Sequence, residues 1–489
     1  MLMSEESDAF QPEVIVPSAN HLLHKTKRKP DIFDKARRST LPFPLTTNRI
    51  NTTPLQLPYN EVVENANNVR PIAHSALQTL LADFLKFKRS GGTDVERTFY
   101  ANVDEHDLID RLLCKRPIAF LNSSDNFMLR DGTKGQGGFD SIGTATEGMA
   151  PAPPDLVLAN YMSYDEIALA ALVGVSTPTH FINDGNRFNR GTPATVGSYE
   201  PCGVYVGLVG ARFEREELME WRHMLVTERQ NTATKGYGAT ADLNAVETRA
   251  LEPWAKFYGA GTESRWFFPS FEEARALAEG EQAAGVPGDN QHFVLVRQLG
   301  YLNCDVFRKR MRAVLEPLLL DANERAFDKL KSAYVHMVGL GIGVWAIDEE
   351  LQEALLVQTV AQILESHFLP HVSDIDFSYF NYCRQCGGVR DGAAFSHLNG
   401  NHVTMHFSKR DPAAKLNGQN EGKLIVAAFA WDGNAFPGNE YWLGQLAATG
   451  DPAAMACSFV AELGNPLIND KVSARYMKYF GNGELRDAS

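Results

Sequence analysis

Apolar and polar positions divide the chain into a polar start and a long alternation of strand-like and helix-like segments. Short continuous apolar runs are typical of buried strands, whereas apolar residues that recur every three or four positions are typical of helices. The alternation of the two predicts an α/β fold, in which helices pack on both faces of a mixed sheet. The predicted strands are 203–210, 334–339, 372–379 and 423–431, and the predicted helices are 165–172 and 350–368.

The first 150 residues follow a different pattern. Residues 1–58 contain Pro, Ser, Thr and clustered charge without a sustained apolar period, which predicts a disordered tail. Beyond them, Leu77, Leu81 and Phe84 recur at helical spacing, and a Gly/Pro-rich linker follows. We therefore expect a helical extension with its linker at 59–150 and an α/β domain with insertions at 151–489.

Charge and composition narrow the classes of partner. The chain has 60 acidic and 47 basic residues and a formal net charge of −13, so nucleic acid is not an expected partner. The apolar run at 424–431 is much shorter than the roughly 20 residues that cross a bilayer, so no membrane span is expected. Six sparse cysteines and an acidic start without an apolar segment favour a cytoplasmic location. A basic run at 25–38 is either a solvated charge cluster or a nuclear import signal.

Three glycines at alternate positions, Gly339, Gly341 and Gly343, lie between a predicted strand and a predicted helix. Glycine permits positive φ and close approach of the backbone, and free N–H groups bind anions, so the loop is a candidate for holding a diphosphate. Its spacing matches neither the GxGxxG motif nor the P-loop. Acidic residues open the helix that follows, so we expect the loop amides, rather than the helix end, to contact the anion. The alternative is that the glycines only allow tight packing of strand on helix.

A second candidate is the acidic loop after the predicted strand at 423–431. It contains Asp432, Asn434, Asn439 and Glu440, and Asp451 follows shortly after. Carboxylates held close together shift each other's pKa values, so that one activates water while another holds a proton, and they also bind a guanidinium or a divalent metal. The alternatives are a simple Asx-turn and, for Asp451, an N-cap before Pro452.

Three weaker signals remain. Phe377, on the strand after the glycine-loop helix, either flanks a base or packs in the core. A single CxxC at Cys383 and Cys386 has two histidines downstream but no second cysteine pair, which makes a metal site a minor alternative. Four glutamates at 214–220 indicate a solvated helix face, with a carboxylate that lines the cleft as the alternative.

Two blocks carry a family resemblance. Residues 334–380 resemble the diphosphate-binding unit of macrodomains, particularly of the poly(ADP-ribose) glycohydrolase branch. Residues 424–451, with WDGN, PGNEYW and GDPAA, resemble the acidic loop of MavL-type macrodomains, which remove ADP-ribose from arginine. The resemblance covers about 155–475 and implies a macrodomain-like fold and a reaction that needs no cofactor. It assigns no metal ligands and leaves open whether a divalent metal assists. It implies catalytic roles for Asp432, Glu440 and Asp451 and ligand contacts by Gly339, Gly341, Gly343, Val344, Trp345, Phe377, Asn434 and Asn439.

The leading hypothesis is an ADP-ribosylhydrolase that acts on ADP-ribosylated arginine of proteins, with ADP-ribose and ADP-ribosylated protein as its partners. The Gln-Glu-Glu signature of poly(ADP-ribose) glycohydrolases is absent, which favours the removal of single ADP-ribose units. A recognition module that binds ADP-ribose or another nucleotide without turnover is the first alternative. A scaffold whose acidic loop binds an arginine of a partner protein is the second.

Overall fold

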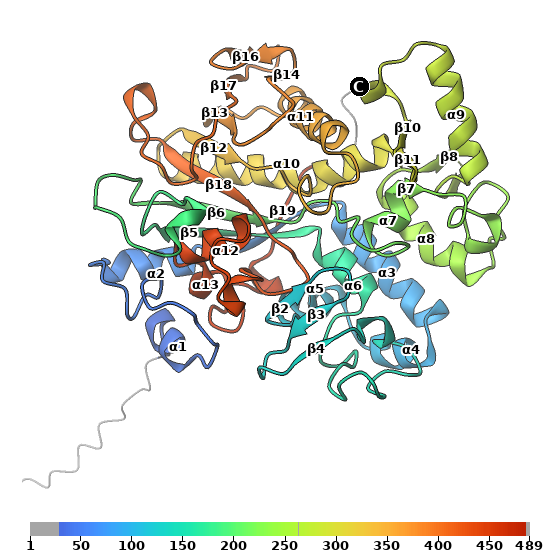
Figure 1. Ribbon diagram of the computed structural model, residues 1–489, viewed down its shortest axis with the longest axis horizontal. Coiled ribbons are helices and arrows are strands. Elements are labelled where there is room, and N and C mark those ends of the chain that lie inside the picture. The colour runs from blue at the N-terminus through green and yellow to red at the C-terminus, as the bar shows by residue number, and fades with distance from the viewer. Residues whose placement is uncertain (1–28, 263, 486–489) are drawn as a thin grey trace, which may run out of the picture.

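A mixed nine-stranded sheet forms the centre of the computed structural model, which describes residues 29–262 and 264–485 (Figure 1). The strand order is β16-β17-β13-β12-β18-β6-β5-β1-β19. Strands β17, β13, β12, β18 and β6 are neighbours that run parallel, so their C-terminal ends meet at one edge of the sheet. The bounds are β1 (Arg70–His74), β5 (Val173–His180), β6 (Cys202–Leu208), β12 (Ala333–Met337), β13 (Val372–Phe377), β16 (Ala394–Ser396), β17 (His402–His406), β18 (Leu424–Ala430) and β19 (Lys478–Phe480).

Helices cover both faces of this sheet. In Figure 1, α12 (Gly450–Ala456) and α13 (Val460–Leu463) lie in front of the sheet, and α10 (Cys304–Asp328) lies behind it. Helix α11 (Glu349–Ser366) packs along α10. The predicted α/β fold with helices on both faces of a mixed sheet is confirmed. Each predicted strand and helix is present within about three residues, as β6, β12, β13, β18, α6 (Tyr164–Ala170) and α11.

Helix α10 was not among the predicted elements, although it is the longest described helix. Its buried side chains include charged residues, which hide its apolar face in the sequence. Inside the protein these charges are paired: the Arg310 guanidinium lies 3.0 Å from Glu220, and Arg325 donates to Asp321 at 2.9 Å. Buried charges of this kind are stable only when they are paired and hydrogen-bonded.

The N-terminal third contributes to the same core. The sequence predicts a disordered tail to residue 58, whereas its described part, from residue 29, contains α1 (Ile32–Arg38) with Ile32 and Ala36 buried. The basic run at 25–38 begins outside the described residues, and its part from residue 29 onward includes α1. Strand β1 pairs with β5 and β19, so the predicted helical extension also supplies a strand to the main sheet. The division into parts at residue 150 stays a prediction.

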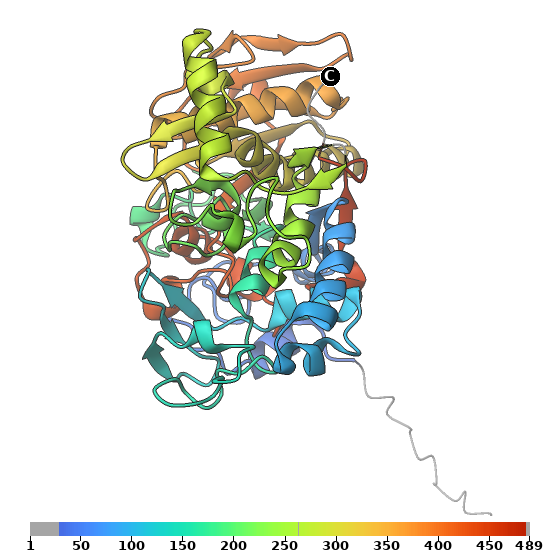
Figure 2. The ribbon, with the colours of Figure 1, turned by 90° about the vertical axis from the view of Figure 1, so that its right-hand side faces the viewer.

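The remaining elements surround the sheet, and Figure 2 shows from the side how the lime-green α9 stands out from the body of the molecule. In the described ranges, no helix has the length and apolarity that a membrane crossing requires. The bounds are α2 (Tyr59–Asn67), α3 (Leu77–Gly91), α4 (Asp94–Tyr100), α5 (Glu105–Cys114), β2 (Ala119–Leu121), β3 (Asn126–Met128), β4 (Lys134–Gln136), α7 (Glu220–Met224), β7 (Leu225–Val226), α8 (Val246–Phe257), β8 (Gly261–Thr262), β9 (Arg265–Trp266), α9 (Phe271–Ala283), β10 (Phe293–Val296), β11 (Gly300–Asn303), β14 (Gln385–Cys386) and β15 (Val389–Arg390).

Candidate active site

Three loops meet at the edge where the parallel strands end. They follow β12, β18 and β6, which are neighbours in the sheet. The loop after β6 touches the glycine loop so closely that a Cβ on Gly210 would lie 2.2 Å from the backbone nitrogen of Gly341. It also touches the acidic loop, because a Cβ on Gly433 would lie 2.6 Å from a methyl group of Val209. The glycine loop and the acidic loop therefore border the same part of the molecule.

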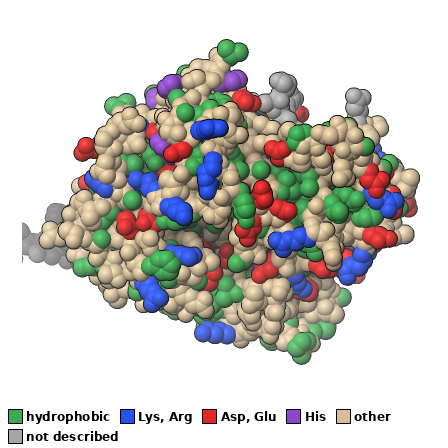
Figure 3. All heavy atoms as spheres, turned by 45° about the horizontal axis from the view of Figure 1, so that its top comes forward, with side chains coloured by type: hydrophobic (Ala, Val, Ile, Leu, Met, Phe, Trp, Pro, Cys, Tyr) green, Lys and Arg blue, Asp and Glu red, His purple; other side chains and the backbone are tan. Residues whose placement is uncertain are grey.

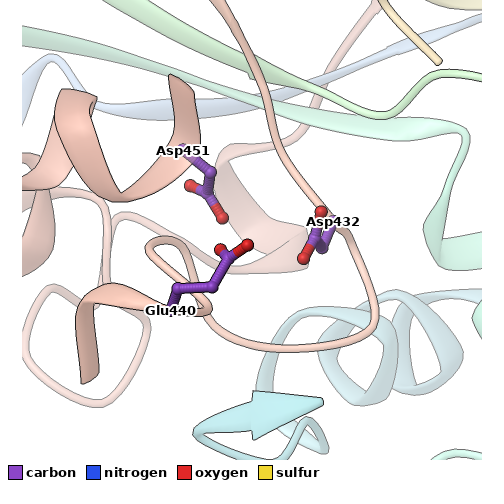
Figure 4. A group of neighbouring side chains, drawn as sticks. All are labelled: Asp432, Glu440 and Asp451. Atoms are coloured by element: carbon purple, nitrogen blue, oxygen red, sulfur yellow. The ribbon is translucent and has the colours of Figure 1, made fainter. Parts of the chain in front are cut away.

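Three carboxylates converge at this edge. Asp432 follows β18, Glu440 precedes a short helical turn, and Asp451 lies in the first turn of α12. Figure 4 shows the three side chains pointing toward one another. One carboxylate oxygen of each lies within 4.8 Å of the others. Asp451 is buried, whereas Asp432 and Glu440 are partly exposed, so the cluster is open on one side.

A hydrogen-bond network fixes this arrangement. The two oxygens of Asp451 accept the backbone N–H groups of Gly438 at 2.8 Å and Asn439 at 3.1 Å. The Asn439 amide donates to Asp432, and its oxygen accepts the N–H of Phe120 at 2.7 Å. Asp451 is therefore not the N-cap that the sequence offered as an alternative: the N-cap of α12 is Thr449, and the Asp451 carboxylate holds the acidic loop.

The carboxylates differ from ordinary surface acids in their electrostatics. Burial raises the pKa of Asp432 to about 7, and the charge of Glu440 acts in the same direction. Burial also raises the pKa of Glu440, and burial together with the charges of Asp432 and Glu440 raises that of Asp451 well above its usual range. The cluster therefore keeps its protons to a higher pH than surface carboxylates do, and a cation bound beside it would oppose this effect.

The cluster is suited to binding a cation. Glu440 Oε2 is buried and accepts no hydrogen bond within the described part of the chain. Either a guanidinium or a divalent metal would supply the missing positive charge. Among the described residues this is the one group of acids, cysteines or histidines with metal-ligand spacing, so Cys383 and Cys386 do not form such a group with the downstream histidines.

The glycine loop presents its backbone to the same edge. No N–H group of residues 340–345 donates to an acceptor in the described protein, and Gly343 and Val344 are exposed, so the loop can offer amides to an anion. The N-terminus of α11 is already occupied, because the Asp348 side chain accepts the N–H of Leu351 at 3.0 Å. This agrees with the expectation that the loop amides, rather than the helix end, contact an anion.

The loop glycines differ in their surroundings, which allows a test. Gly341 has φ +72°, and a Cβ there would lie 2.6 Å from the backbone oxygen of Ala211, whereas a Cβ on Gly343 would meet nothing within 4 Å. We expect Gly341→Ala to lower the free energy of unfolding by about 1–3 kcal/mol. Gly343→Ala is expected to leave stability unchanged. On the prediction that this loop holds a diphosphate, its methyl group should weaken ADP-ribose binding at least tenfold. Chemical denaturation and calorimetry check both variants, and unaltered affinity in Gly343→Ala would remove this glycine from the contact.

Arg212, in the loop after β6, belongs to the site although no sequence pattern had singled it out. Its guanidinium lies 5.2 Å from the centre of the Trp345 ring and 5.6 Å from that of Phe120. Its Nε and Nη2 donate to Glu214 at 3.0 and 2.5 Å. Arg212 follows β6, which ends at the same edge of the sheet as β12 and β18. This position could have identified Arg212 from the sequence.

The glutamates at 214–220 do not form the solvated helix face that the sequence favours. Helix α7 begins only at Glu220, which is buried against Arg310. Glu214, by contrast, is partly buried, and its negative charge contributes to the raised pKa of Asp432. Glu214 therefore lies near the carboxylate cluster, and the alternative interpretation of a carboxylate that lines a cleft stays a prediction.

Removing Arg212 is expected to shift the pH dependence of any reaction that needs ionised Asp432. The Arg212 charge lowers the pKa of Asp432, so Arg212→Met should raise this pKa and move the acidic limb of the rate profile to higher pH. A pH–rate profile measures the shift. Arg215→Met, which removes a cation bound instead to Asp125 and Asp140, is the matched control. Equal profiles for all three proteins would contradict the assignment.

The remaining predicted ligand residues divide into two groups. Val344 is 87% exposed at the tip of the glycine loop, Trp345 packs on Arg212, and Asn434 is buried with neither side-chain atom hydrogen-bonded within the described chain. Phe377, by contrast, is fully buried, and its ring stacks on Phe407 at 4.9 Å. Its place is in the core, as the alternative interpretation held, and the structure does not bring it to the site.

Comparison with known proteins agrees with this geometry. The family model "ADP-ribosylhydrolase MavL-like" matches residues 30–480. Two proteins of Drosophila melanogaster, named ADP-ribosylarginine hydrolase CG3568 and ADP-ribosylarginine hydrolase CG2909, are each 35% identical to this chain. The first alignment covers 84% of this chain and 77% of the relative, and the second covers 83% and 78%. The similarity therefore extends over the whole sheet and all three loops.

Proposed function

Because this chain belongs to the MavL-like ADP-ribosylhydrolase family, we propose that it removes single ADP-ribose units from arginine side chains of proteins. The observation that carries the proposal is the convergence of the acidic cluster and the glycine loop at one edge of the sheet. The names of the two Drosophila relatives support arginine as the modified residue. The parallel strands β12 and β18 bring the glycine loop and the acidic loop to one edge of the sheet. This arrangement also supports the more specific proposal that the fold is related to macrodomains.

The geometry suggests how the substrate lies. The free amides of residues 340–345 hold the diphosphate, which places the ribose next to it over the carboxylates. The arginine guanidinium is cationic, and Glu440, with its unpaired buried oxygen, binds it. This cation opposes the burial and the charge repulsion that raise the pKa values of the cluster.

The reaction then needs only water. Ionised Asp432 orients a water molecule and takes its proton, while the water oxygen bonds to C1 of the ribose and the bond from C1 to the guanidinium nitrogen breaks. A proton returns to the departing nitrogen, which leaves arginine and free ADP-ribose. Asp432 and Asp451 stabilise the oxocarbenium-like charge that develops on the ribose. Asp451 does so while holding the loop through its two backbone contacts.

The test is incubation of an arginine-ADP-ribosylated protein with the wild-type chain, followed by chromatography of the released nucleotide. Release of free ADP-ribose together with unmodified arginine is the expected result. Without any release, the hydrolase assignment fails. Calorimetry with ADP-ribose then identifies the alternative, since tight binding without turnover would describe a recognition module.

A further inference from the structure

One charge inside the molecule differs from the charges on its surface. On the face drawn in Figure 3, acidic and basic side chains are interspersed at the surface. Arg116, by contrast, lies between α5 and β2 and is fully buried. Its Nε donates to the backbone oxygen of Leu112 at 2.7 Å, whereas Nη1 and Nη2 have no hydrogen-bond partner in the described ranges. Arg116 is therefore a buried cation that leaves most of its donors unused.

This arrangement is unfavourable for the stability of the fold. No carboxylate of the described chain forms an ion pair with Arg116, and burial lowers the pKa of its guanidinium to about 9. A buried charge without a partner costs free energy, and an apolar side chain of similar size is often neutral or stabilising in its place. Packing alone therefore does not explain an arginine here. Residues that lower stability in this way are expected at functional sites.

The guanidinium faces the start of the acidic loop. It lies 4.0 Å from the centre of the Trp431 ring, which is close enough for a cation–π interaction. The backbone N–H of Trp431 donates to Leu208, at the end of β6, at 2.8 Å, and its Nε1 donates to the oxygen of Ala435 at 3.2 Å. Asp432 is the next residue in the chain. The orientation of the Trp431 ring therefore determines the position of the backbone that carries the Asp432 carboxylate.

The residues that follow Arg116 contact the same loop. The backbone oxygen of Pro117 accepts the N–H of Phe436 at 3.1 Å. The backbone of Phe120, in β2, exchanges two hydrogen bonds with the Asn439 side chain, each of 2.7 Å. Segment 116–120 therefore holds the acidic loop at three points. Of these contacts, only that of Arg116 is made by a side chain of the segment, so a substitution can remove it.

We propose that Arg116 is a positioning residue of the hydrolase, whose guanidinium fixes Trp431 and thereby holds the Asp432 carboxylate against C1 of the ribose. This inference rests on the proposed function, in which Asp432 takes a proton from water. A displacement of about 1 Å at such a group costs up to about 10²-fold in rate. Because Arg116 is fully buried, it does not touch the substrate. Its removal should therefore slow the chemical step and leave binding unchanged.

The test compares variants of Arg116 with the wild type on free ADP-ribosyl-arginine. Arg116→Met removes the cation and keeps an apolar chain, and it is expected to lower kcat about thirtyfold and to change KM and the Kd of ADP-ribose less than about twofold. Its denaturation midpoint should equal or exceed that of the wild type, because an unpaired buried charge is lost. Arg116→Lys keeps a cation at this position and should restore kcat to within about fivefold of the wild type.

Arg265→Met is the matched control. Arg265 is also a cation beside an aromatic ring, 5.4 Å from the centre of Phe267, but it belongs to β9, which packs against α8. This variant is expected to keep the kcat of the wild type. Turnover by Arg116→Met within threefold of the wild type, or an equal loss in Arg265→Met, would overturn the inference. A lower denaturation midpoint of Arg116→Met would assign Arg116 to the stability of the fold and would overturn it as well.

Hydrogen exchange separates this inference from the proposed function. The backbone N–H groups of Gly438 and Asn439 are bonded to Asp451, so their exchange reports whether the acidic loop keeps its position. Arg116→Met should speed their exchange at least about tenfold and leave the exchange of α9 unchanged. If the wild type releases no ADP-ribose, the proposed function fails, and the exchange still tests Arg116. Equal exchange of the loop in both proteins would refute the positioning role.

Discussion

Replacing Asp432 by asparagine is expected to lower the turnover of ADP-ribosyl-arginine about a thousandfold and to leave ADP-ribose binding nearly unchanged. Asparagine keeps the size of the side chain and cannot take a proton from water, and general-base catalysis is typically worth 10²–10⁴-fold. Steady-state kinetics and calorimetry measure the two quantities. Asp470→Asn, an exposed acid in the same C-terminal segment, is the control and should keep full activity. Turnover by Asp432→Asn within tenfold of the wild type would contradict the assigned role.

The same variant should gain stability at alkaline pH. Asp432 has a pKa of about 7 when folded, above the value of about 4 in an unfolded chain, so the folded state binds its proton more tightly. The stability that this proton contributes is fully present below about pH 4 and is lost as the pH rises through 7. Asparagine mimics the neutral form, so Asp432→Asn should unfold at a higher denaturant concentration than the wild type at pH 8. A lower midpoint at pH 8 would mean that the loss of turnover reflects damage to the fold.

Replacing Asp451 by asparagine is expected to reduce both turnover and stability. One of the two backbone N–H groups of Gly438 and Asn439 would face an amide NH₂ instead of an oxygen, and a buried donor without an acceptor costs about 1–3 kcal/mol. The acidic loop would then lose its position, and we expect turnover to fall at least about a hundredfold. Denaturation curves measure the loss of stability, and steady-state kinetics on the same preparation measure the loss of turnover. Unchanged stability would show that the two hydrogen bonds do not hold the loop.

The central strands could be predicted from the sequence alone because they are buried on both faces of the sheet. The apolar runs of β6, β12 and β18 need no tertiary information to be identified, and parallel neighbours end at one edge. Asp432 and Gly341 follow two of these strands and therefore lie at the same edge of the sheet. The acidic residues that open α11 likewise predicted that the helix end does not hold an anion, and in the structure Asp348 caps this end.

Other parts of the site depend on contacts that no local pattern contains. The acidic loop is held by hydrogen bonds between Asn439 and Phe120, which are 319 positions apart in the chain. The Arg116 guanidinium lies 4.0 Å from the centre of the ring of Trp431, the residue that precedes Asp432 in the chain. Nothing in the sequence around Arg116 indicates this contact. Helix α10 was missed for a related reason, since its buried charges are neutralised only by partners such as Glu220 and Arg70 from distant segments. Phe377 was ambiguous because core and ligand-stacking aromatics have the same pattern.

Hydrolysis as proposed requires that one ligand touches both the glycine loop and the acidic loop. A crystal structure of Asp432→Asn with uncleaved ADP-ribosyl-arginine measures this directly. We predict that the diphosphate accepts hydrogen bonds from the amides of residues 340–345, that the guanidinium contacts Glu440, and that C1 of the ribose faces position 432. A ligand that leaves the carboxylates untouched, or that binds away from the glycine loop, would contradict the account.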